Sequence, residues 1–301
     1  MLKKVSDLFS MVKDLKSKKL VCIASADEEV LEAIHDACEM GSIEATLIGP
    51  LPEIAKIMHE KKYRLEDYTI IDCDDNEKGS EYAMQMVNRG EADIIMKGLL
   101  DTRVVLKAVV NKEYGIRKAA LLNHVGLASF PQFNRTLFFT DGAMLIAPSV
   151  EDRIHMIQNS VDFMHLLGYE QPKVGLVSAV EKVNPKMQST VDAQAIVEQY
   201  RSGRVTGCIV DGPFAVDNCV SVASAVHKGI VSPVAGWCDL LVFPTIEAGN
   251  VFYKTAVHLA KADVAGIILG AKVPIVLTSR ADSRQAKLNS IILSCLVSKN
   301  Y

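Results

Sequence analysis

The chain has 301 residues, 49% of them hydrophobic and 23% charged, a composition typical of ordered globular proteins. Lysine and arginine number 33 and aspartate and glutamate 36, so the composition supplies neither a basic surface for nucleic acid nor an acidic tail. A length of 301 residues favours two domains of roughly 150 residues each over one large domain.

The N-terminal region and the hydropathy pattern bear on where the protein works. The first nineteen residues contain six lysines, but Asp7 and Asp14 interrupt them and apolar residues recur at helical spacing. This pattern favours an amphipathic surface helix over a targeting signal. No apolar stretch approaches the roughly 20 residues needed to span a bilayer. We therefore expect a cytoplasmic protein with no membrane partner.

The cysteines and histidines lack the spacings of metal sites. The seven cysteines are scattered and never form C-x-x-C, and the seven histidines form neither H-E-x-x-H nor H-x-H. We therefore expect no metal and no disulfide framework.

The first half of the chain alternates between strand and helix patterns. Strands are expected at 20–25, 45–48, 69–73, 94–96 and 119–122, and helices at 28–40, 53–61, 80–89 and 103–112. Gly41 ends the first of these helices. Such alternation predicts a mostly parallel sheet covered by helices.

The alternation begins again at Thr136. Strands are expected at 137–139, 143–146, 174–177, 208–210, 240–243, 266–269 and 275–277, and helices at 150–167, 190–200, 250–262 and 283–297. The sequence therefore predicts an α/β protein of two domains, each with a mostly parallel sheet flanked by helices. A cleft between the domains is the expected ligand site.

Three common nucleotide and hydrolase motifs are absent. The chain has no G-x-G-x-x-G after a strand, no G-x-x-x-x-G-K-[ST] and no G-x-S-x-G. Their absence disfavours dinucleotide, nucleoside triphosphate and serine hydrolase chemistry.

Residues 274–284 place the polar end of an apolar strand directly before a helix. Free backbone N–H groups and the helix dipole favour anions at such a position. Arg280 can bind phosphate or carboxylate there, and Ser279 can donate to a developing oxyanion. Alternatively, Asp282 caps the helix with Gln285 as its capping-box partner, and the arginines are solvated.

Residues 243–254 repeat this arrangement with a glycine in the loop. Gly249 allows close backbone approach to a ligand, Asn250 can cap the following helix, and Lys254 lies one turn inside it. The alternative is a plain helix cap with an exposed lysine.

Several residues of these segments combine into a longer pattern. They are Pro244, Gly249, Asn250, Tyr253, Lys254, Gly270, Pro274, Ser279 and Arg280. In order and spacing they resemble the C-terminal signature of the phosphate acetyltransferase and butyryltransferase family. The similarity extends upstream through residues 96–102, 139–143, 180–187 and 211–218, and the Thr-Ser-Arg-Ala-Asp-Ser run at 278–283 is most similar to the butyryl branch.

The resemblance implies a two-domain architecture of the phosphate acyltransferase and isocitrate dehydrogenase type, with a cleft that holds coenzyme A. The end of the chain would return to the first domain, so the expected domains are 1–135 plus 280–301, and 136–279. It also implies homo-oligomers, no metal and no cofactor, with acyl-CoA and inorganic phosphate as substrates.

Carried over to this chain, the family's serine and arginine fall on Ser279, as transition-state donor, and Arg280, as anion binder. Acetyl members have a catalytic aspartate seven positions after that serine, where this chain has Ala286. Asp282 is the nearest candidate for the base, unless it is only a cap. Thr278 and Ser283 are expected to bind substrate beside it.

The resemblance also points to a loop of the first domain where a strand ends and a helix begins. Lys97, Gly98, Thr102 and Arg103 are expected there to bind phosphate or the phosphates of coenzyme A, and Gly249, Asn250 and Lys254 to bind substrate in the second domain. His124 is interpreted as a structural histidine rather than a general base.

The expected reaction is the reversible conversion of butanoyl-CoA and phosphate to butanoyl phosphate and CoA. Direct thiol attack in a ternary complex suffices, and a covalent acyl-Ser279 or acyl-cysteine intermediate is the alternative. Three other functions stay open: phosphate acetyltransferase, a dehydrogenase of related fold, and a non-catalytic ligand-binding protein.

Overall fold

The computed structural model describes residues 2–279 and 282–298, and the chain divides into two compact units. Unit 1 comprises Met1–Val5 and Ala120–Val264, and unit 2 comprises Ser6–Ala119 and Ala265–Tyr301. The chain passes between the units earlier than the expected boundaries after residues 135 and 279. The strand that follows Ala120 pairs within unit 1, and the strand near residue 265 pairs within unit 2.

Unit 2 is built on a six-stranded sheet. Its strands are β1 (Lys18–Ile23), β2 (Ile43–Gly49), β3 (Thr69–Asp72), β4 (Ile94–Lys97), β10 (Asp263–Leu269) and β11 (Ile275–Val276). They lie in the order β3-β2-β1-β4-β11-β10, with every neighbouring pair parallel except β11 and β10. The mostly parallel sheet expected from the alternating pattern is confirmed.

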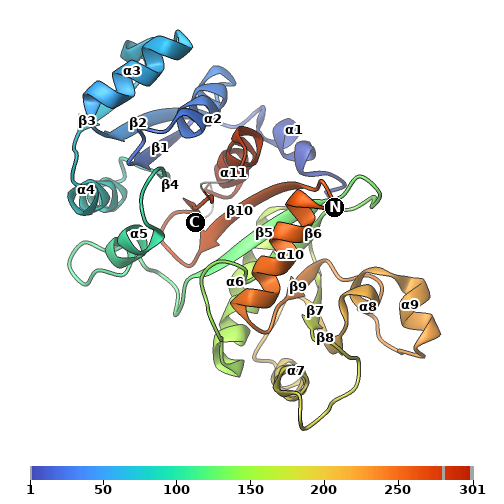
Figure 1. The fold of residues 1–301 in the computed structure, drawn as a ribbon. Helices are drawn as coiled ribbons and strands as arrows, with labels where there is room; N and C mark the ends of the chain where they lie inside the picture. Colours follow the sequence, from blue (N-terminus) through green and yellow to red (C-terminus); the bar gives the residue numbers. More distant parts are fainter. Residues whose placement is uncertain (1, 280–281, 299–301) are drawn as a thin grey trace. The chain divides into compact units, whose positions relative to one another are not determined.

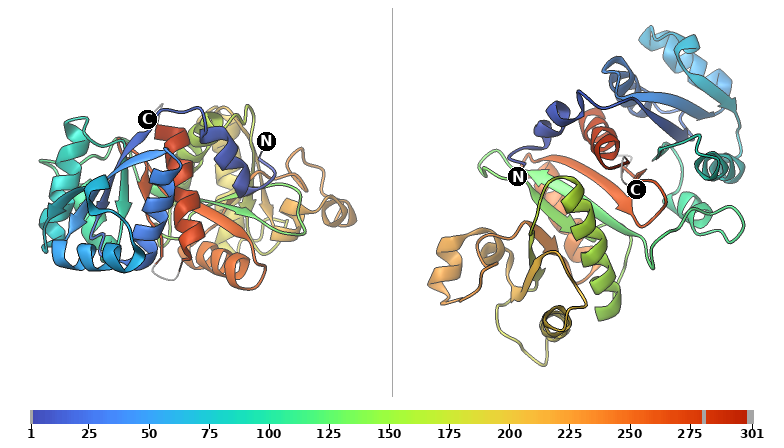
Figure 2. Two further views of the ribbon diagram at one scale, coloured as in Figure 1. Left: turned by 90° about the horizontal axis from the view of Figure 1, so that it is seen from above. Right: turned by 180° about the vertical axis from the view of Figure 1, so that it is seen from behind.

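Helices cover both faces of this sheet (Figure 1). They are α1 (Leu8–Val12), α2 (Glu28–Glu39), α3 (Leu51–Lys61), α4 (Asn76–Asn88), α5 (Thr102–Val109) and α11 (Arg284–Val297), with short 3₁₀ turns η1 (Val5–Asp7) and η2 (Leu65–Asp67). The C-terminal α11 packs against α1 and α2, and both views of Figure 2 show it beside α2. Helices α4 and α5 pack against each other.

Local sequence signals explain where α2 begins and ends. The Asp27 side chain accepts a hydrogen bond from the Val30 N–H (3.0 Å), which satisfies one free donor of the first turn. Gly41 follows the helix with a φ of +68°, a conformation that costs glycine little. The expected end of the helix at Gly41 is therefore confirmed.

Unit 1 contains a five-stranded sheet. Its strands are β5 (Asn123–Ser129), β6 (Leu137–Thr140), β7 (Lys173–Val177), β8 (Ile209–Phe214) and β9 (Leu240–Val242), and its helices are α6 (Val150–Leu166), α7 (Gln188–Arg201), α8 (Val216–Val220), α9 (Val222–His227) and α10 (Ile246–His258). The order is β5-β6-β9-β7-β8, antiparallel between β5 and β6 and parallel elsewhere.

The N-terminal residues contribute to unit 1 before the chain enters unit 2. The Leu2 N–H donates to the Tyr169 hydroxyl and the Val5 N–H to Ser129 Oγ, each at 3.1 Å. Leu2 and Val5 are both buried. The expected amphipathic helix is shorter than the stretch of helical spacing in the sequence. Its helical part comprises the 3₁₀ turn η1 and helix α1.

Two expected strands are wrong. Residues 119–122 form no strand: the chain bends at 119–121, the Ala119 N–H donates to the distant Gly270 carbonyl, and β5 begins only at Asn123. Residues 143–146 form no strand, because the Asp141 carboxylate accepts the N–H groups of Ala143 and Met144 (2.7 and 2.8 Å) and closes a turn.

No helix in the described part of the chain is long and apolar enough to cross a membrane. Within those residues, no three side chains of His, Cys, Asp or Glu gather as a metal site would require.

Candidate active site

Three strands of unit 2 end at the same edge of the sheet, because β1, β4 and β11 are parallel. From β1 the chain adds β2 and β3 on one side, and then β4 on the other side of β1. The strand order therefore reverses between β1 and β4. Open α/β sheets bind ligands at such switch points, beyond the carboxyl ends of the strands.

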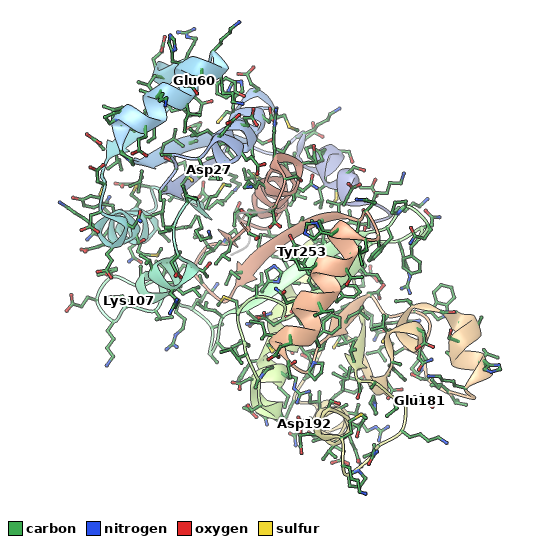
Figure 3. The ribbon with its side chains drawn as sticks, viewed as in Figure 1. Asp27, Glu60, Lys107, Glu181, Asp192 and Tyr253 are labelled. Atoms are coloured by element: carbon green, nitrogen blue, oxygen red, sulfur yellow. The ribbon has the colours of Figure 1, made fainter. Side chains whose placement is uncertain are left out.

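A small pocket, partly open to solvent, lies at this edge. Its lining residues, all from unit 2, are Asp27, Val30, Lys97, Gly98, Leu99, Thr278, Ser279 and Lys287. We call it the switch-point pocket; Asp27 is labelled in Figure 3. It brings together four residues that the sequence singled out, namely Lys97, Gly98, Thr278 and Ser279.

Gly98 closes the gap between the ends of β4 and β1. Its N–H donates to the Ile23 carbonyl, and the Leu99 N–H donates to the Ala24 carbonyl, both at 2.8 Å. A Cβ at Gly98 would lie 2.1 Å from the Ala24 oxygen, closer than any side chain could approach. Only glycine lets the two strand ends meet in this way.

Lys97 is the last residue of β4 and is only 4% exposed. Its Nζ donates to the carbonyl oxygens of Gly98 (3.1 Å) and Leu100 (3.2 Å). A buried ammonium group is costly unless hydrogen bonds compensate for its lost water. These two carbonyls hold the cation in the wall of the pocket.

Ser279 and Asp282 close a turn between β11 and α11. The Ser279 N–H donates to Asp282 Oδ2 (2.7 Å), and the Asp282 N–H donates to the Ser279 carbonyl (3.1 Å). Asp282 is buried and therefore fixes the backbone on which Ser279 faces the pocket. Arg280 lies outside the described residues, so its predicted anion-binding role stays a prediction.

The alternative interpretation of Asp282 as the helix cap is wrong. Ser283 is the N-cap residue of α11, and its Oγ accepts the Ala286 N–H at 3.3 Å. The Gln285 amide donates to Asn289 rather than back to the cap. Asp282 lies one residue too early and bonds to Ser279 instead. Ser283 thus has a structural role, and its predicted contact with substrate stays a prediction.

Thr102 and Arg103 begin α5 but do not line the switch-point pocket. Asp101 caps this helix by accepting the Arg103 N–H at 2.8 Å. The Arg103 side chain is 91% exposed and lies 3.5 Å from the Asp101 carboxylate. The structure therefore does not place Thr102 and Arg103 in this pocket, and their predicted contacts with phosphate stay a prediction.

Gly249, Asn250 and Lys254 belong to unit 1 and lie within α10. The expectation that Asn250 caps this helix is wrong, because α10 begins at Ile246 and Thr245 caps it by accepting the Ala248 N–H. The Lys254 Nζ lies 4.8 Å from the centre of the Tyr253 ring, which Figure 3 labels.

Gly249 and Asn250 hold the turn at 141–144 against α10. The Asn250 side chain donates to the Gly142 carbonyl (3.1 Å), and a Cβ at Gly249 would lie 2.1 Å from the Asp141 carbonyl oxygen. His124 is buried within β5, and its backbone N–H donates to the Asp141 carboxylate (2.8 Å). These contacts are structural, and the predicted roles of Gly249, Asn250 and Lys254 in substrate binding remain untested predictions.

Comparison with known proteins places the chain among transferases. Residues 77–295, well over half of the chain, match the sequence model of the family described as "Phosphate acetyl/butaryl transferase". The chain belongs to this family. The family resemblance drawn from the sequence motifs is therefore confirmed.

Members of the family with different names are similarly related to the chain. It is 41% identical to a phosphate butyryltransferase of Clostridium beijerinckii, over 99% of this chain and 98% of the relative. It is 44% identical to a phosphate acetyltransferase of Thermotoga maritima, over 93% of this chain and 95% of that protein. A branched-chain phosphotransacylase of Enterococcus faecalis shares 29% identity and a TM-score of 0.84, covering 94% of this chain and 100% of that structure.

In this family member, no carboxylate stands where the acetyl members are expected to place theirs. Ala286 occupies that position in the first turn of α11, and its N–H donates to the capping Ser283. Asp282 is the carboxylate nearest to Ser279 in sequence, and it is bonded to the Ser279 backbone. It remains the candidate base.

Four of the seven cysteines are poorly suited to form an acyl-cysteine intermediate. Cys22, in β1 near Lys97, is fully buried, and this burial raises its thiol pKa far above the ordinary value even though the Lys97 charge lowers it. Burial likewise raises the pKa of Cys38, Cys208 and Cys295 to about 12. A thiol must ionise to act as a nucleophile, and these do so only at strongly basic pH.

Sequence reasoning missed two polar residues of the switch-point pocket, Asp27 and Lys287. Asp27 was readable as the cap of α2, since it precedes two glutamates and an apolar helical pattern. Lys287 gave a weaker signal. It is a cation in the first turn of a helix, where the macrodipole disfavours positive charge.

Proposed function

We propose that the protein catalyses the reversible transfer of a short acyl group, butyryl or branched, between coenzyme A and inorganic phosphate. One observation carries this proposal. The switch-point pocket joins Lys97 and Gly98 to Thr278 and Ser279, which lie about 180 residues further along the chain. A cationic, hydroxyl-bearing pocket at a strand switch point suits an anionic substrate. Relatives over nearly the full chain are named phosphate butyryltransferase and phosphate acetyltransferase.

The reaction needs a nucleophile, an anion site and a donor to the oxyanion. In the direction that consumes acyl phosphate, the coenzyme A sulfur bonds to the acyl carbon, its proton passes to a base, and the carbon–oxygen bond to phosphate breaks. Ser279 donates to the carbonyl oxygen as negative charge develops on it. Asp282 is the candidate acceptor of the thiol proton, and Arg280 binds the phosphate.

Phosphate acetyltransferase is the second candidate. The Thermotoga maritima relative with that name is slightly more identical to the chain than the butyryltransferase, at 44% against 41%. The butyryl assignment rests instead on the Thr-Ser-Arg-Ala-Asp-Ser run and on the likeness to a branched-chain phosphotransacylase. We also propose that the protein works as a homo-oligomer in the cytoplasm, which sedimentation analysis and cell fractionation would test.

The proposed function is tested by incubating the protein with butyryl-CoA and measuring free thiol with and without inorganic phosphate. We expect phosphate-dependent release of coenzyme A with a chelator present and no nicotinamide added. Butanoyl phosphate should form in equal amount. The Ser279→Ala variant serves as the matched control for a contaminating activity. Full activity that requires a metal or NAD, or release of thiol independent of phosphate, would contradict the assignment.

A further inference from the structure

Lys287 is a buried cation at a position where the local structure disfavours one. It is the fourth residue of α11 and is only 3% exposed. The positive end of the helix dipole raises the cost of an ammonium group in the first turn, and burial raises it further. Stability of α11 therefore does not explain why a lysine stands here.

The protein groups around Lys287 compensate its charge in part. Its Nζ contacts the Glu29 carboxylate (2.7 Å) and the Asp282 carbonyl oxygen. Glu29 is 50% exposed, so water screens its charge. An ammonium group has three donors, and within residues 2–279 and 282–298 these two atoms occupy two of them. One donor remains for a ligand in the switch-point pocket that Lys287 lines.

The same pocket holds a second buried ammonium group, that of Lys97. Among the residues that line the pocket, Asp27 carries the one carboxylate. This carboxylate accepts the Val30 N–H and caps α2. An anion in this pocket would lie between two ammonium groups, of which Lys287 is compensated by the half-exposed Glu29. Inorganic phosphate and the phosphoryl group of an acyl phosphate are small anions with more than one negative charge.

We propose that Lys97 and Lys287 together seat the reacting phosphate in the switch-point pocket. This proposal rests on the proposed function and decides between two predicted ligands of Lys97, the reacting phosphate and the phosphates of coenzyme A. Ser279 lines the same pocket, and its expected target is the oxygen of the acyl carbon to which the reacting phosphate is bonded. The phosphates of coenzyme A are separated from its thiol by the long pantetheine arm, so they lie far from that carbon.

Lys287 would also hold the pocket in shape. Through its bond to the Asp282 carbonyl it fixes the turn in which the Asp282 carboxylate binds the Ser279 N–H. Loss of the cation should therefore weaken phosphate binding and lower turnover, whereas the affinity for acyl-CoA should change little.

The test replaces Lys287 by methionine, which keeps the length and apolar stem of the side chain and removes its charge. Loss of a charge-assisted hydrogen bond predicts a rise of about 10- to 100-fold in the KM for inorganic phosphate. The KM for butyryl-CoA should stay within about twofold, and Lys287→Arg should recover part of the phosphate affinity. Binding of inorganic phosphate alone, measured by calorimetry, should weaken in parallel.

Lys107→Met is the matched control, because it removes a lysine from the same unit outside the pocket. Lys107 is 75% exposed and paired with Glu77, and Figure 3 labels it on α5. Its KM for phosphate should stay within about twofold of the parent value, as expected for an exposed pair. If Lys287→Met does not fold, Lys97→Met answers the same question, since the proposal places both lysines on one anion.

The outcomes separate this proposal from the proposed function. Folded Lys287→Met with an unchanged KM for phosphate would overturn the phosphate seat, and so would a rise in the KM for butyryl-CoA instead. A parent protein that releases no coenzyme A would refute the proposed function. In that case the calorimetric comparison of phosphate binding by parent and variant still tests the seat.

Discussion

Ser279 is the residue at which the end of β11, the switch-point pocket and the turn into α11 meet. We expect Ser279→Ala to lower turnover by about 10²- to 10³-fold, the usual effect of removing one donor to a developing oxyanion. The KM for acyl-CoA should change little, because the donor acts mainly on charge present in the transition state. Steady-state kinetics and a melting curve measure the two effects. Turnover within about threefold of the parent, less than 1 kcal/mol in barrier height, would move the catalytic centre elsewhere.

The Asp282 carboxylate accepts the Ser279 N–H, and it is also the candidate base. The Asp282→Asn variant separates these two roles. Asparagine retains an oxygen that can accept the Ser279 N–H, so the melting temperature should stay close to that of the parent. It cannot take the thiol proton as a carboxylate does, so turnover should fall by at least about 10²-fold if Asp282 is the base. Unchanged turnover in the folded variant would leave Asp282 with its turn-forming role alone.

Helix α6 begins with a complete capping box, and its contribution to stability is open to measurement. Ser149 Oγ accepts the Asp152 N–H (3.1 Å), and the Asp152 carboxylate accepts the Ser149 N–H (2.9 Å). Ser149→Ala should lower the free energy of unfolding by about 1 kcal/mol, as measured by urea denaturation. Ser202→Ala, at the exposed end of α7, is the matched control and should cost less than about 0.5 kcal/mol.

The same box predicts a pH dependence. Hydrogen bonds from the Ser149 hydroxyl and then from its N–H lower the pKa of Asp152 in the folded protein below the ordinary value of 3.8. The associated stabilisation is complete above that ordinary value and is lost as the pH falls through the lowered pKa. The difference between parent and Ser149→Ala should therefore be largest near neutral pH and shrink below about pH 4. A difference that grows in acid would contradict the assignment of this bond.

The elements differ in how far their sequences predicted them. The parallel strands of unit 2 are short apolar runs bounded by turns, and their positions were read to within a few residues. Strand β5 was missed, because the expected strand at 119–122 ends just before Asn123, where β5 begins. The fold compensates for the burial of Asn123, because its side-chain amide donates to the Thr140 hydroxyl (3.1 Å).

The predicted start of helix α10, at residue 250, was too late, because the helix begins at Ile246. Gly249 was read as a loop residue, whereas in the fold it lies inside the helix. The position requires glycine because the Asp141 carbonyl leaves no space for a Cβ. A glycine required by a neighbour distant in sequence cannot be told from a glycine required by a turn. Local pattern therefore cannot decide such positions.

At the scale of the whole molecule, the candidate site depends on contacts between segments far apart in the chain. The sequence marked each strand end separately, with Lys97 and Gly98 in one segment and Thr278 and Ser279 in another. Their meeting follows from the pairing of β4 with β11, which places both ends at one edge of the sheet. Lys287 escaped notice because a lysine is normally exposed, whereas the packing of α11 against its neighbours, α2 among them, buries it.

Choice of acyl group is a property of the whole enzyme and gives the last prediction. We expect kcat/KM to be highest for butyryl-CoA or a branched four- to five-carbon thioester and lower for acetyl-CoA. Each additional buried methylene discriminates by only about 1–3 kcal/mol, so several acyl groups should be accepted at graded rates. A panel of acyl-CoA thioesters assayed at saturating phosphate measures the order. Because relatives of both names are about equally identical to the chain, a clear preference for acetyl-CoA would assign it to the acetyl branch instead.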